Sequence, residues 1–444
     1  MTGDAADRSW WSRLAGASAA NLGLQVAATA LGLVTSVLLG RWLGADGMGV
    51  YAFAFALVNI LGVLARLGLE IVTVRDVAVL LDQRDGSGLR GLASFAPRAG
   101  LVAGVTIGAI AVGVVALTGA DAATVRTTAV AMGLLVALTL VSLHGAILRG
   151  LHHTVIANVP ANLVRPVAFA AAVGGLWWAG ASSEPELAMA SHLAAGVIAL
   201  VVATVARERY LPDWVRDAAP RVEVRRWMTA AAPMLVLGGL GVLNRQLDVV
   251  MMKSLSTDAE TGVYAIAVQL STFISMVLTA LNLVIAPRFA SLHAAGRTVE
   301  LQRLVATSSA IVTAGTVPIA VVLVGLSPWL LPFWGHEFVD ARIPFAILAA
   351  GNVVNALSGS VGYLLIMSGN ERLVARVFAA VAALNIVLNA VLIPRLGAPG
   401  AATATAVSMA LWNLTLIVLV RRRLGINSTV FAWLTRGSWG ARRG

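Results

Sequence analysis

The ten residues GVYAFAFALV at positions 49–58 recur, nearly unchanged, as GVYAIAVQLS at positions 262–271. Six of the ten positions are identical, and the two copies lie 213 residues apart in a chain of 444 residues. A spacing of almost half the chain length indicates an internal duplication. Two unrelated Gly- and Ala-rich helices could also match by composition, so the position of each copy in the topology has to decide between the two readings.

The composition indicates which solvent surrounds the chain. Hydrophobic residues make up 59% of it and charged residues only 12%, whereas charged residues are about 25% of a typical soluble domain. An integral membrane protein is therefore predicted. The net charge of +11 is typical of loops that follow the positive-inside rule, and it does not require a nucleic-acid partner. The chain contains no cysteine, which excludes disulfides and thiolate metal sites.

Long apolar runs predict an all-α integral membrane fold. A helix needs about 20 mostly apolar residues to cross the bilayer, and the runs lack the alternation of transmembrane β-strands. The first run is interpreted as a retained span, because no A-x-A-like cleavage site follows it. The twelve predicted transmembrane helices are at residues 17–40, 48–69, 96–118, 126–149, 156–180, 185–206, 228–252, 262–287, 303–326, 341–367, 372–394 and 399–420.

The basic residues predict the orientation of these helices. If the N-terminus is placed in the cytoplasm, most of the 32 basic residues lie in cytoplasmic loops and tails. This asymmetry predicts a multi-pass protein with both termini in the cytoplasm. The basic residues left on the outer side are Arg41, Arg126, Lys253, Arg342 and Arg395.

The repeated motif opens the second span in each half of the chain, which favours a true duplication. Each half then holds six helices, and six is even, so the halves are parallel repeats related by a pseudo-twofold axis along the membrane normal. Secondary transporters with repeats of this kind hold their substrate between the halves. The predicted domains are an N-terminal six-helix lobe, a cytoplasmic linker, a C-terminal six-helix lobe and a basic cytoplasmic tail, at residues 1–206, 207–227, 228–420 and 421–444.

Three longer segments resemble a known family. NLGLQVAATALGLVTSVLLGRWLGADGMGVYAFAFALVNIL (21–61) is similar to the N-terminal signature of the polysaccharide-biosynthesis (Wzx-like) flippases. LNRQLDVVMMKSLSTDAETGVYAIAVQL (243–270) and LLIMSGNERLVARVFAAVAALNIVLNAVLIPRLGAPGAATATAVS (364–408) are similar to the same family around its seventh to eighth and eleventh to twelfth helices. These flippases share a superfamily with multidrug-and-toxin-extrusion transporters and peptidoglycan-lipid flippases.

The resemblance implies a function. Members of the family export lipid-linked oligosaccharides, typically on undecaprenyl pyrophosphate, by alternating access from the inner to the outer leaflet of the bacterial plasma membrane. It implies no cofactor other than a coupling ion, Na⁺ or H⁺. The partners it implies are the lipid-linked glycan, membrane lipids and other polysaccharide-assembly membrane proteins. The basic tail, which interleaves Arg with Trp and Phe, suits an anionic leaflet and not a nucleic acid.

Three arginines within the predicted spans are expected to bind the substrate's pyrophosphate. Burying an Arg at mid-bilayer costs at least ~2.5 kcal/mol, and its planar fork of donors fits phosphate oxygens. Arg165, next to Pro166, is the deepest. Arg66 lies near a cytoplasmic helix end and could instead snorkel, and Arg245 could instead pair with Asp248, three residues on. The alternative for Arg165 is that it pairs with the carbonyls of a neighbouring helix at the proline break.

Oxygen-bearing side chains of the C-terminal half predict a coupling-ion site. Asp248, Asn385, Asn389 and Thr403, with Thr405 nearby, fall at a similar depth in the outer half of the bilayer, and hard oxygen ligands suit Na⁺ or a titratable proton. The resemblance to peptidoglycan-lipid flippases, which bind sodium among helices seven, eleven and twelve, implies the same place. The alternative is that these groups only join helices by hydrogen bonds. No other metal site is expected.

Four more polar residues within spans are expected to line the substrate cavity that the resemblance implies, with interhelical hydrogen bonding as the alternative. They are Asn21, Gln25, Asn59 and Gln269. His144 and His192 are each expected to be packed histidines and not parts of a proton relay.

An enzyme is not expected. Polytopic polymerases and ligases of polysaccharide pathways carry a long external loop with catalytic residues, and here no predicted external loop exceeds roughly fifteen residues. Drug export is the closer alternative, because fold alone does not fix the substrate. The arginines within the spans favour an anionic substrate over a cationic drug.

Overall fold

The computed structural model describes residues 3–434, and every regular element in that range is a helix. Helices are expected wherever a chain crosses lipid, because each backbone N–H and carbonyl must find a partner within the chain itself. The predicted all-α class is therefore confirmed. The chain forms two compact units, one up to Val250 and one from Met251 on, so the division falls inside α9. The domain boundaries derived from the sequence stay predictions.

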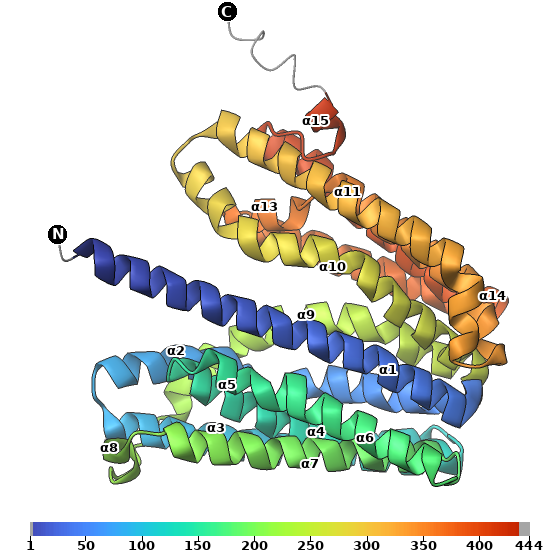
Figure 1. The fold of residues 1–444 in the computed structure, drawn as a ribbon, viewed down its shortest axis with the longest axis horizontal. Helices are drawn as coiled ribbons and strands as arrows, with labels where there is room; N and C mark the ends of the chain where they lie inside the picture. The colour runs from blue at the N-terminus through green and yellow to red at the C-terminus, as the bar shows by residue number, and fades with distance from the viewer. Residues whose placement is uncertain (1–2, 435–444) are drawn as a thin grey trace, which may run out of the picture. The chain divides into compact units, whose positions relative to one another are not determined.

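The first unit is built around α4, which packs against both α3 and α7 (Figure 1). Its elements are α1 (Gly3–Ala65), α2 (Leu69–Asp82), α3 (Gly86–Leu117), α4 (Ala122–Gly150), α5 (Thr154–Val159), the π-helix η1 (Pro160–Val164), α6 (Arg165–Trp178), α7 (Pro185–Tyr210), α8 (Asp213–Arg216) and α9 (Val224–Leu255), the last of which runs on past Val250.

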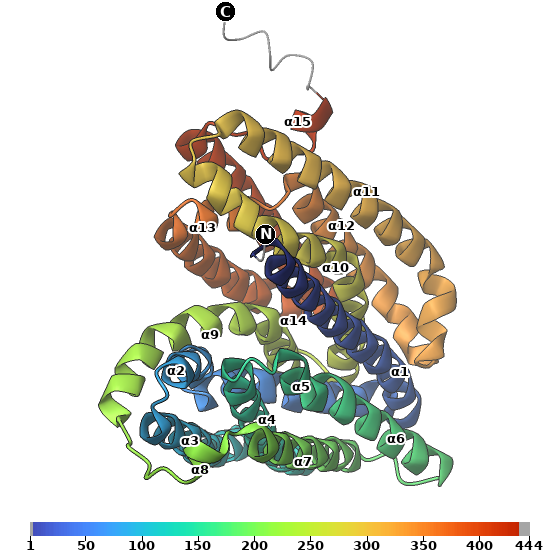
Figure 2. The ribbon, with the colours of Figure 1, turned by 60° about the vertical axis from the view of Figure 1, so that its left-hand side comes forward.

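In the second unit, α12 packs against α11 and α14 (Figure 2). The elements are α10 (Asp258–Ala294), α11 (Thr298–Leu330), the 3₁₀ helices η2 (Leu331–Phe333) and η3 (His336–Ala341), α12 (Arg342–Ser358), α13 (Val361–Met367), α14 (Glu371–Leu424) and α15 (Phe431–Leu434).

Two long helices, α1 and α14, each run through two of the predicted spans and are kinked at a glycine between them, although α1 ends at Ala65, before the end of the predicted span 48–69. The kinks are at Gly44 (φ 67°) and Gly397 (φ 57°), a backbone conformation that favours glycine. Both glycines stand in the same short pattern, LGADG and LGAPG. At position 397 a Cβ would also collide with the carboxylate of Glu260, so the second kink excludes a side chain for two reasons.

Nine segments within residues 3–434 are long and apolar enough to cross a membrane. Two of these segments, in α1 and α14, hold two predicted spans each. The predicted span 228–252 lies in α9, and part of it falls outside the residues whose side chains are described. The multi-pass character is thus confirmed, whereas the count of twelve spans stays a prediction.

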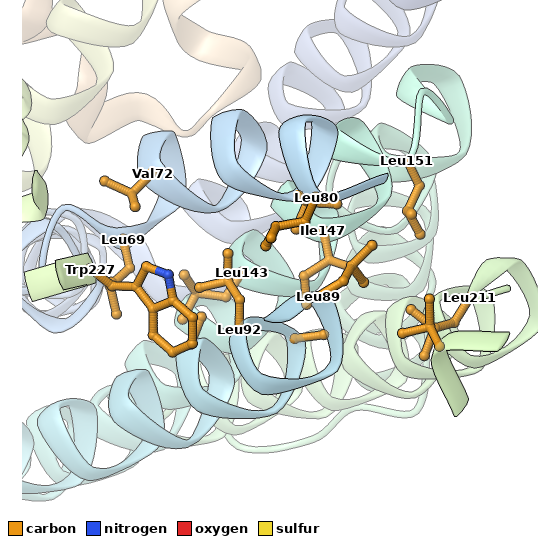
Figure 3. Close-up of a cluster of buried hydrophobic side chains, with 14 of the residues drawn as sticks. Leu69, Val72, Leu80, Leu89, Leu92, Leu143, Ile147, Leu151, Leu211 and Trp227 are labelled. Atoms are coloured by element: carbon orange, nitrogen blue, oxygen red, sulfur yellow. The ribbon is translucent and has the colours of Figure 1, made fainter. Parts of the chain in front are cut away.

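A cluster of buried apolar side chains joins α2, α3 and α4 and anchors the start of α9 (Figure 3). Leu69, Leu89, Leu143 and Ile147 are fully buried there, and Trp227 of α9 is only 1% exposed. Trp227 packs its ring against Phe95 of α3 with a centroid distance of 5.3 Å. The cluster therefore ties the segment that follows α7 to the body of the first unit.

The segment between α7 and α9, residues 211–223, packs on the start of α3. The N–H of Arg221 donates to the carbonyl of Ser87 at 2.9 Å, and its guanidinium pairs with Asp85. Asp85 also caps α3 by accepting from the N–H of Gly88 at 2.9 Å. The capping bond, and then the pairing with Arg221, hold the pKa of Asp85 below its ordinary value. Its contribution to stability is therefore present at neutral pH and is lost as the pH falls through that lowered pKa.

The C-terminal segment, residues 425–432, folds back onto α11. The side-chain amide of Gln302 donates to the carbonyl of Asn427 and accepts from its N–H, both at 2.7 Å. The hydroxyl of Ser309 donates to the carbonyl of Ser428 at 2.6 Å, and Ser428 is fully buried. A side-chain amide that pairs with a backbone amide in both directions fixes the position of the segment.

The same segment closes a break in the predicted span 341–367. α12 and α13 are separated at Gly359, with φ 73°. The last carbonyls of a helix have no partner in that helix, and here the carbonyl of Leu357 accepts from the N–H of Val430 at 3.1 Å. The C-terminal segment therefore supplies a donor that lipid could not.

Replacing Gly91 by alanine tests the packing of residues 211–223 on α3. A Cβ at position 91 would collide with the carbonyl of Arg221, and overpacking of this kind costs ~1–3 kcal/mol. We expect Gly91→Ala to lower the midpoint of thermal unfolding in detergent and to speed tryptic cleavage between α7 and α9. Gly113→Ala in the same helix is the control, because its Cβ would meet nothing within 4 Å. An equal loss in both variants would contradict the packing described.

Candidate functional site

A π-helical turn positions Arg165 at the start of α6. The turn spans Pro160–Val164, and the N–H of Arg165 donates to the carbonyl of Pro160. π-turns are frequent at functional sites, because the extra residue changes the direction of the side chains that follow. Arg165 lies within the apolar segment Thr154–Trp178, where a cation requires polar partners.

The partner of Arg165 is a histidine. Nη1 of Arg165 is 3.0 Å from Nε2 of His192 on α7, and Nδ1 of His192 is 2.8 Å from the hydroxyl of Tyr51 on α1. Nε of Arg165 also donates to the carbonyl of Ala161 at 3.5 Å. Among the side chains whose placement is described, no carboxylate pairs with Arg165. The Tyr51–His192–Arg165 chain of hydrogen bonds thus joins α1, α6 and α7 around a cation with neutral partners.

Aromatic rings fix the orientation of His192. Its ring is stacked on Phe169 with a centroid distance of 4.0 Å and an interplanar angle of 12°, and the centroid of Phe55 is 5.0 Å away. Tyr51 stacks on both phenylalanines at 6.2 Å. His192 is 3% exposed and Tyr51 is 5% exposed. The imidazole therefore cannot rotate freely, and its two nitrogens face fixed directions.

The contact between Tyr51 and His192 has a counterpart in the second unit. Tyr264 occupies the same place in the repeated motif, and its hydroxyl lies 3.4 Å from that of Thr405. Both contacts span 141 residues, so Thr405 corresponds to His192 at the same 213-residue spacing as the motifs. The repeated spacing therefore extends to a tertiary contact, with an imidazole in one unit where the other has a hydroxyl.

His144 of α4 also has polar partners on α7, further along that helix than His192. Its Nδ1 is 3.2 Å from the hydroxyl of Thr204, and its Nε2 is 3.3 Å from Nη1 of Arg207. Both histidines were expected to be packed, and both are buried. The sequence reasoning nevertheless missed their polar partners, and with them the roles of Tyr51 and His192 around Arg165.

Arg66 follows the end of α1, in the turn that leads to α2. Its Nε is 3.4 Å from Oε2 of Glu70, and the other oxygen of Glu70 is 2.8 Å from Nη2 of Arg149. One carboxylate is thus shared by two guanidiniums, which leaves a surplus of one positive charge. Arg66 thus pairs with Glu70 near the helix end, and its part in substrate binding stays a prediction.

Arg245 and Asp248 differ in burial. Arg245 is exposed, whereas Asp248, three residues further along α9, is only 4% exposed. The phosphate contact predicted for Arg245 and the cation site predicted for Asp248 stay predictions.

Asn385, Asn389 and Thr403 of α14 each have a hydrogen bond within that helix. Asn385 and Asn389 are buried, and Nδ2 of Asn389 donates to Oδ1 of Asn385 at 3.0 Å. The hydroxyl of Thr403 donates to the carbonyl of Pro399 at 2.8 Å. Asp248 belongs to the first unit and these residues to the second, so the proposed ion site stays a prediction. Within the described part of the chain, no group of three or more His, Asp or Glu residues could hold a metal ion.

Among the four remaining polar residues, Asn21 joins two helices. Oδ1 of Asn21 accepts from Nδ2 of Asn158 at 2.9 Å, which links α1 to α5. Nδ2 of Asn59 donates at 2.9 Å to the carbonyl four residues before it in α1. Gln25 is exposed, and Gln269 is partly buried. Contacts of these side chains with sugar hydroxyls stay predictions.

The fold is that of transporters of the MOP superfamily. A multidrug resistance MATE family transporter in its inward-facing conformation has a TM-score of 0.73 at 12% identity, covering 91% of this chain and 98% of that chain. The lipid II flippase MurJ, inward closed, has a TM-score of 0.69 at 13% identity, covering 91% and 87%. A MOP superfamily transporter from Pyrococcus furiosus has a TM-score of 0.59 at 14% identity, covering 91% and 95%.

Comparison of the sequence with curated proteins finds no match. The sequence profile described as polysaccharide biosynthesis protein, however, matches residues 16–293, which is more than half of the chain and includes both copies of the repeated motif. The chain belongs to the polysaccharide biosynthesis protein family.

Proposed function

We propose that this protein is an alternating-access flippase that exports a polyprenyl-pyrophosphate-linked oligosaccharide from the inner to the outer leaflet of a bacterial plasma membrane. The exported glycan would serve the synthesis of cell-surface polysaccharide. Family membership and the MOP fold support a membrane transporter, and the structure of a lipid II flippase has the same fold. The partners of the protein would be the glycan lipid, membrane lipids and other membrane proteins of polysaccharide assembly.

Arg165 carries the proposal for an anionic substrate. It lies in an apolar segment and bonds only neutral groups among the side chains described. A cation without a carboxylate partner keeps its full charge for a ligand, and a guanidinium can bind phosphate oxygens in a bidentate manner. Arg66 and Arg245 would add to this positive potential, with Asn21, Gln25, Asn59 and Gln269 as contacts for sugar hydroxyls.

Coupling to an ion is a second part of the proposal. The sequence contains no G-x-x-x-x-G-K-[ST] loop, so the nucleotide-binding loop of ATP-driven transporters is missing. One monovalent cation moved through 100 mV supplies about 2.3 kcal/mol. We propose Asp248 as the ligand of Na⁺ or H⁺, together with Asn385, Asn389 and Thr403.

The finer architecture belongs to the same proposal. Twelve spans in two six-helix lobes with a pseudo-twofold axis along the membrane normal would place both termini in the cytoplasm. The repeated tyrosine contacts at equal sequence spacing support the duplication, and the two kinked helices supply one break each between predicted spans.

A multidrug exporter is the alternative function, because a MATE family transporter has the same fold. Such an exporter would accept cationic drugs, for which the charge of Arg165 is unfavourable. Drug resistance that is lost on deletion, without accumulation of a lipid-linked glycan, would favour this alternative.

Arg165→Ala tests the substrate proposal in a strain that lacks the chromosomal gene. Losing one charged hydrogen-bond donor costs ~1.5–3 kcal/mol, so we expect export to fall by about tenfold or more and the lipid-linked glycan to accumulate, as measured by mass spectrometry. Arg126→Ala is the control, since Arg126 pairs with Glu186 at an exposed position. Normal export by the Arg165→Ala variant would contradict the proposed anion-binding site.

Asp248→Asn tests the ion site in proteoliposomes with sodium and proton gradients imposed separately. We expect the variant to lose its response to the gradient that drives the parent while remaining folded, because the neutral amide cannot balance a cation's charge. Asp258→Asn is the matched control, as Asp258 pairs with Lys253. A variant that still responds to the same gradient would place the site elsewhere.

Single cysteines test the orientation, because the chain has none of its own. Ser183 and Ala295 are exposed residues in loops on opposite predicted sides of the membrane. In intact cells we expect a membrane-impermeant maleimide to label Ser183→Cys and not Ala295→Cys, and to label both after permeabilisation. The reverse pattern would place the termini outside.

A further inference from the structure

We infer that His192, held by Tyr51, is a positioning residue that aims the guanidinium of Arg165 at the anionic substrate and does so in its neutral form. The inference rests on the proposed function, because it takes Arg165 as the group that binds phosphate. It assigns a role to a buried side chain that the sequence offered only as packing.

The hydrogen bonds fix the protonation state of His192. A guanidinium is a donor only, so Nε2, which lies 3.0 Å from Nη1 of Arg165, must accept and carries no proton. In a neutral imidazole the proton is then on Nδ1, which donates to the Tyr51 hydroxyl 2.8 Å away. The contacts therefore select one neutral tautomer of the two that imidazole can adopt.

The two contacts of His192 can be compared with the corresponding contact in the second unit. There, Thr405 stands opposite Tyr264 and supplies a hydroxyl for the tyrosine. At this position of the second unit, a hydroxyl therefore takes part in the link between the two helices. Unlike a hydroxyl, an imidazole has a second nitrogen on the opposite side of its ring. In the first unit, that nitrogen meets Arg165.

The anchoring leaves Arg165 able to bind a ligand. Of the five N–H groups of a guanidinium, one on Nη1 reaches His192 and the one on Nε reaches Ala161. The remaining donors are enough for bidentate contact with a phosphate. Because Phe169 and Phe55 hold the imidazole in place, the guanidinium is oriented before the substrate arrives, which reduces the ordering that binding requires.

Protonation of His192 would break this arrangement. A proton on Nε2 turns the acceptor into a donor that faces a fixed cation. The titratable groups that face the ring are Tyr51 on α1 and Arg165 on α6. Among the other elements packed against this part of α7, α5 and η1 contain no titratable residue. The three titratable residues of α4, each with a partner elsewhere, are Arg126, His144 and Arg149.

Two substitutions of His192 separate positioning from packing. His192→Gln keeps an acceptor for Arg165 and a donor for Tyr51, whereas His192→Thr reproduces the pair seen between Thr405 and Tyr264 and abolishes the acceptor for Arg165. We expect the glutamine variant to export within about threefold of the parent and the threonine variant to lose about tenfold or more, like Arg165→Ala. His144→Gln is the control, because its neighbour Arg207 has no part in the proposed site.

The outcomes distinguish the inference from the proposed function. If Arg165→Ala exports normally, the proposed anionic site fails, and the inference fails with it. If Arg165→Ala loses export while His192→Thr matches the parent, the anionic site stands and the positioning role of His192 is overturned. Thermal unfolding of each variant in detergent identifies a loss that is due to misfolding, in which case the comparison passes to the glutamine variant alone at low and neutral pH.

A spectroscopic and a pH readout complete the test. In ¹⁵N-histidine spectra of the full chain, the signal that disappears in His192→Gln should show a neutral ring protonated at Nδ1; a ring protonated at Nε2 or at both nitrogens would overturn the inference. Parental export should fall on acidification as this signal titrates, and the glutamine variant should not follow it. Parental export that instead rises on acidification would mean that the imidazolium binds the anion directly.

Discussion

Lipid offers no water to a free N–H or carbonyl, and this constraint accounts for the irregular parts of the structure as well as its helices. Where the chain leaves the regular helix before Arg165, the N–H of that residue still finds the carbonyl of Pro160 by a longer step. Where α12 stops, Leu357 receives a donor from Val430, far along the sequence. In both places, another backbone group replaces the helical hydrogen bond that is lost.

The same constraint applies with more force to charge. Arg165 has neutral partners. The side chain that forms a hydrogen bond with it, His192, is in turn hydrogen-bonded to Tyr51. A carboxylate would have neutralised the guanidinium and cancelled its attraction for an anion, whereas an imidazole orients it and leaves the charge intact. The two copies of the repeated motif thus differ in the partner of their tyrosine, which is the imidazole of His192 in one unit and the hydroxyl of Thr405 in the other.

Hydropathy was sufficient to predict an all-α, multi-pass membrane fold, because membrane helices are long and their composition is set by lipid. The site was less predictable. Arg165 was identified by its position in an apolar run, but His192 and Tyr51 are 141 residues apart, and no local pattern connects them. The repeat shows the spacing of the two tyrosines. Their partners, a histidine and a threonine, are too different in sequence to be recognised as equivalent. The packing of Arg221 on α3 likewise depends on backbone approach at Gly91, which a sequence does not display.

The C-terminal segment has a consequence for how the protein is made. Chains emerge from the ribosome N-terminus first, and the N-terminal parts begin to fold first. Leu357 is therefore inserted well before Val430, its donor, has been translated. Until Val430 has been translated, the carbonyl of Leu357 lacks this donor, so the end of α12 can complete its hydrogen bonding only after the whole of α14 has been made.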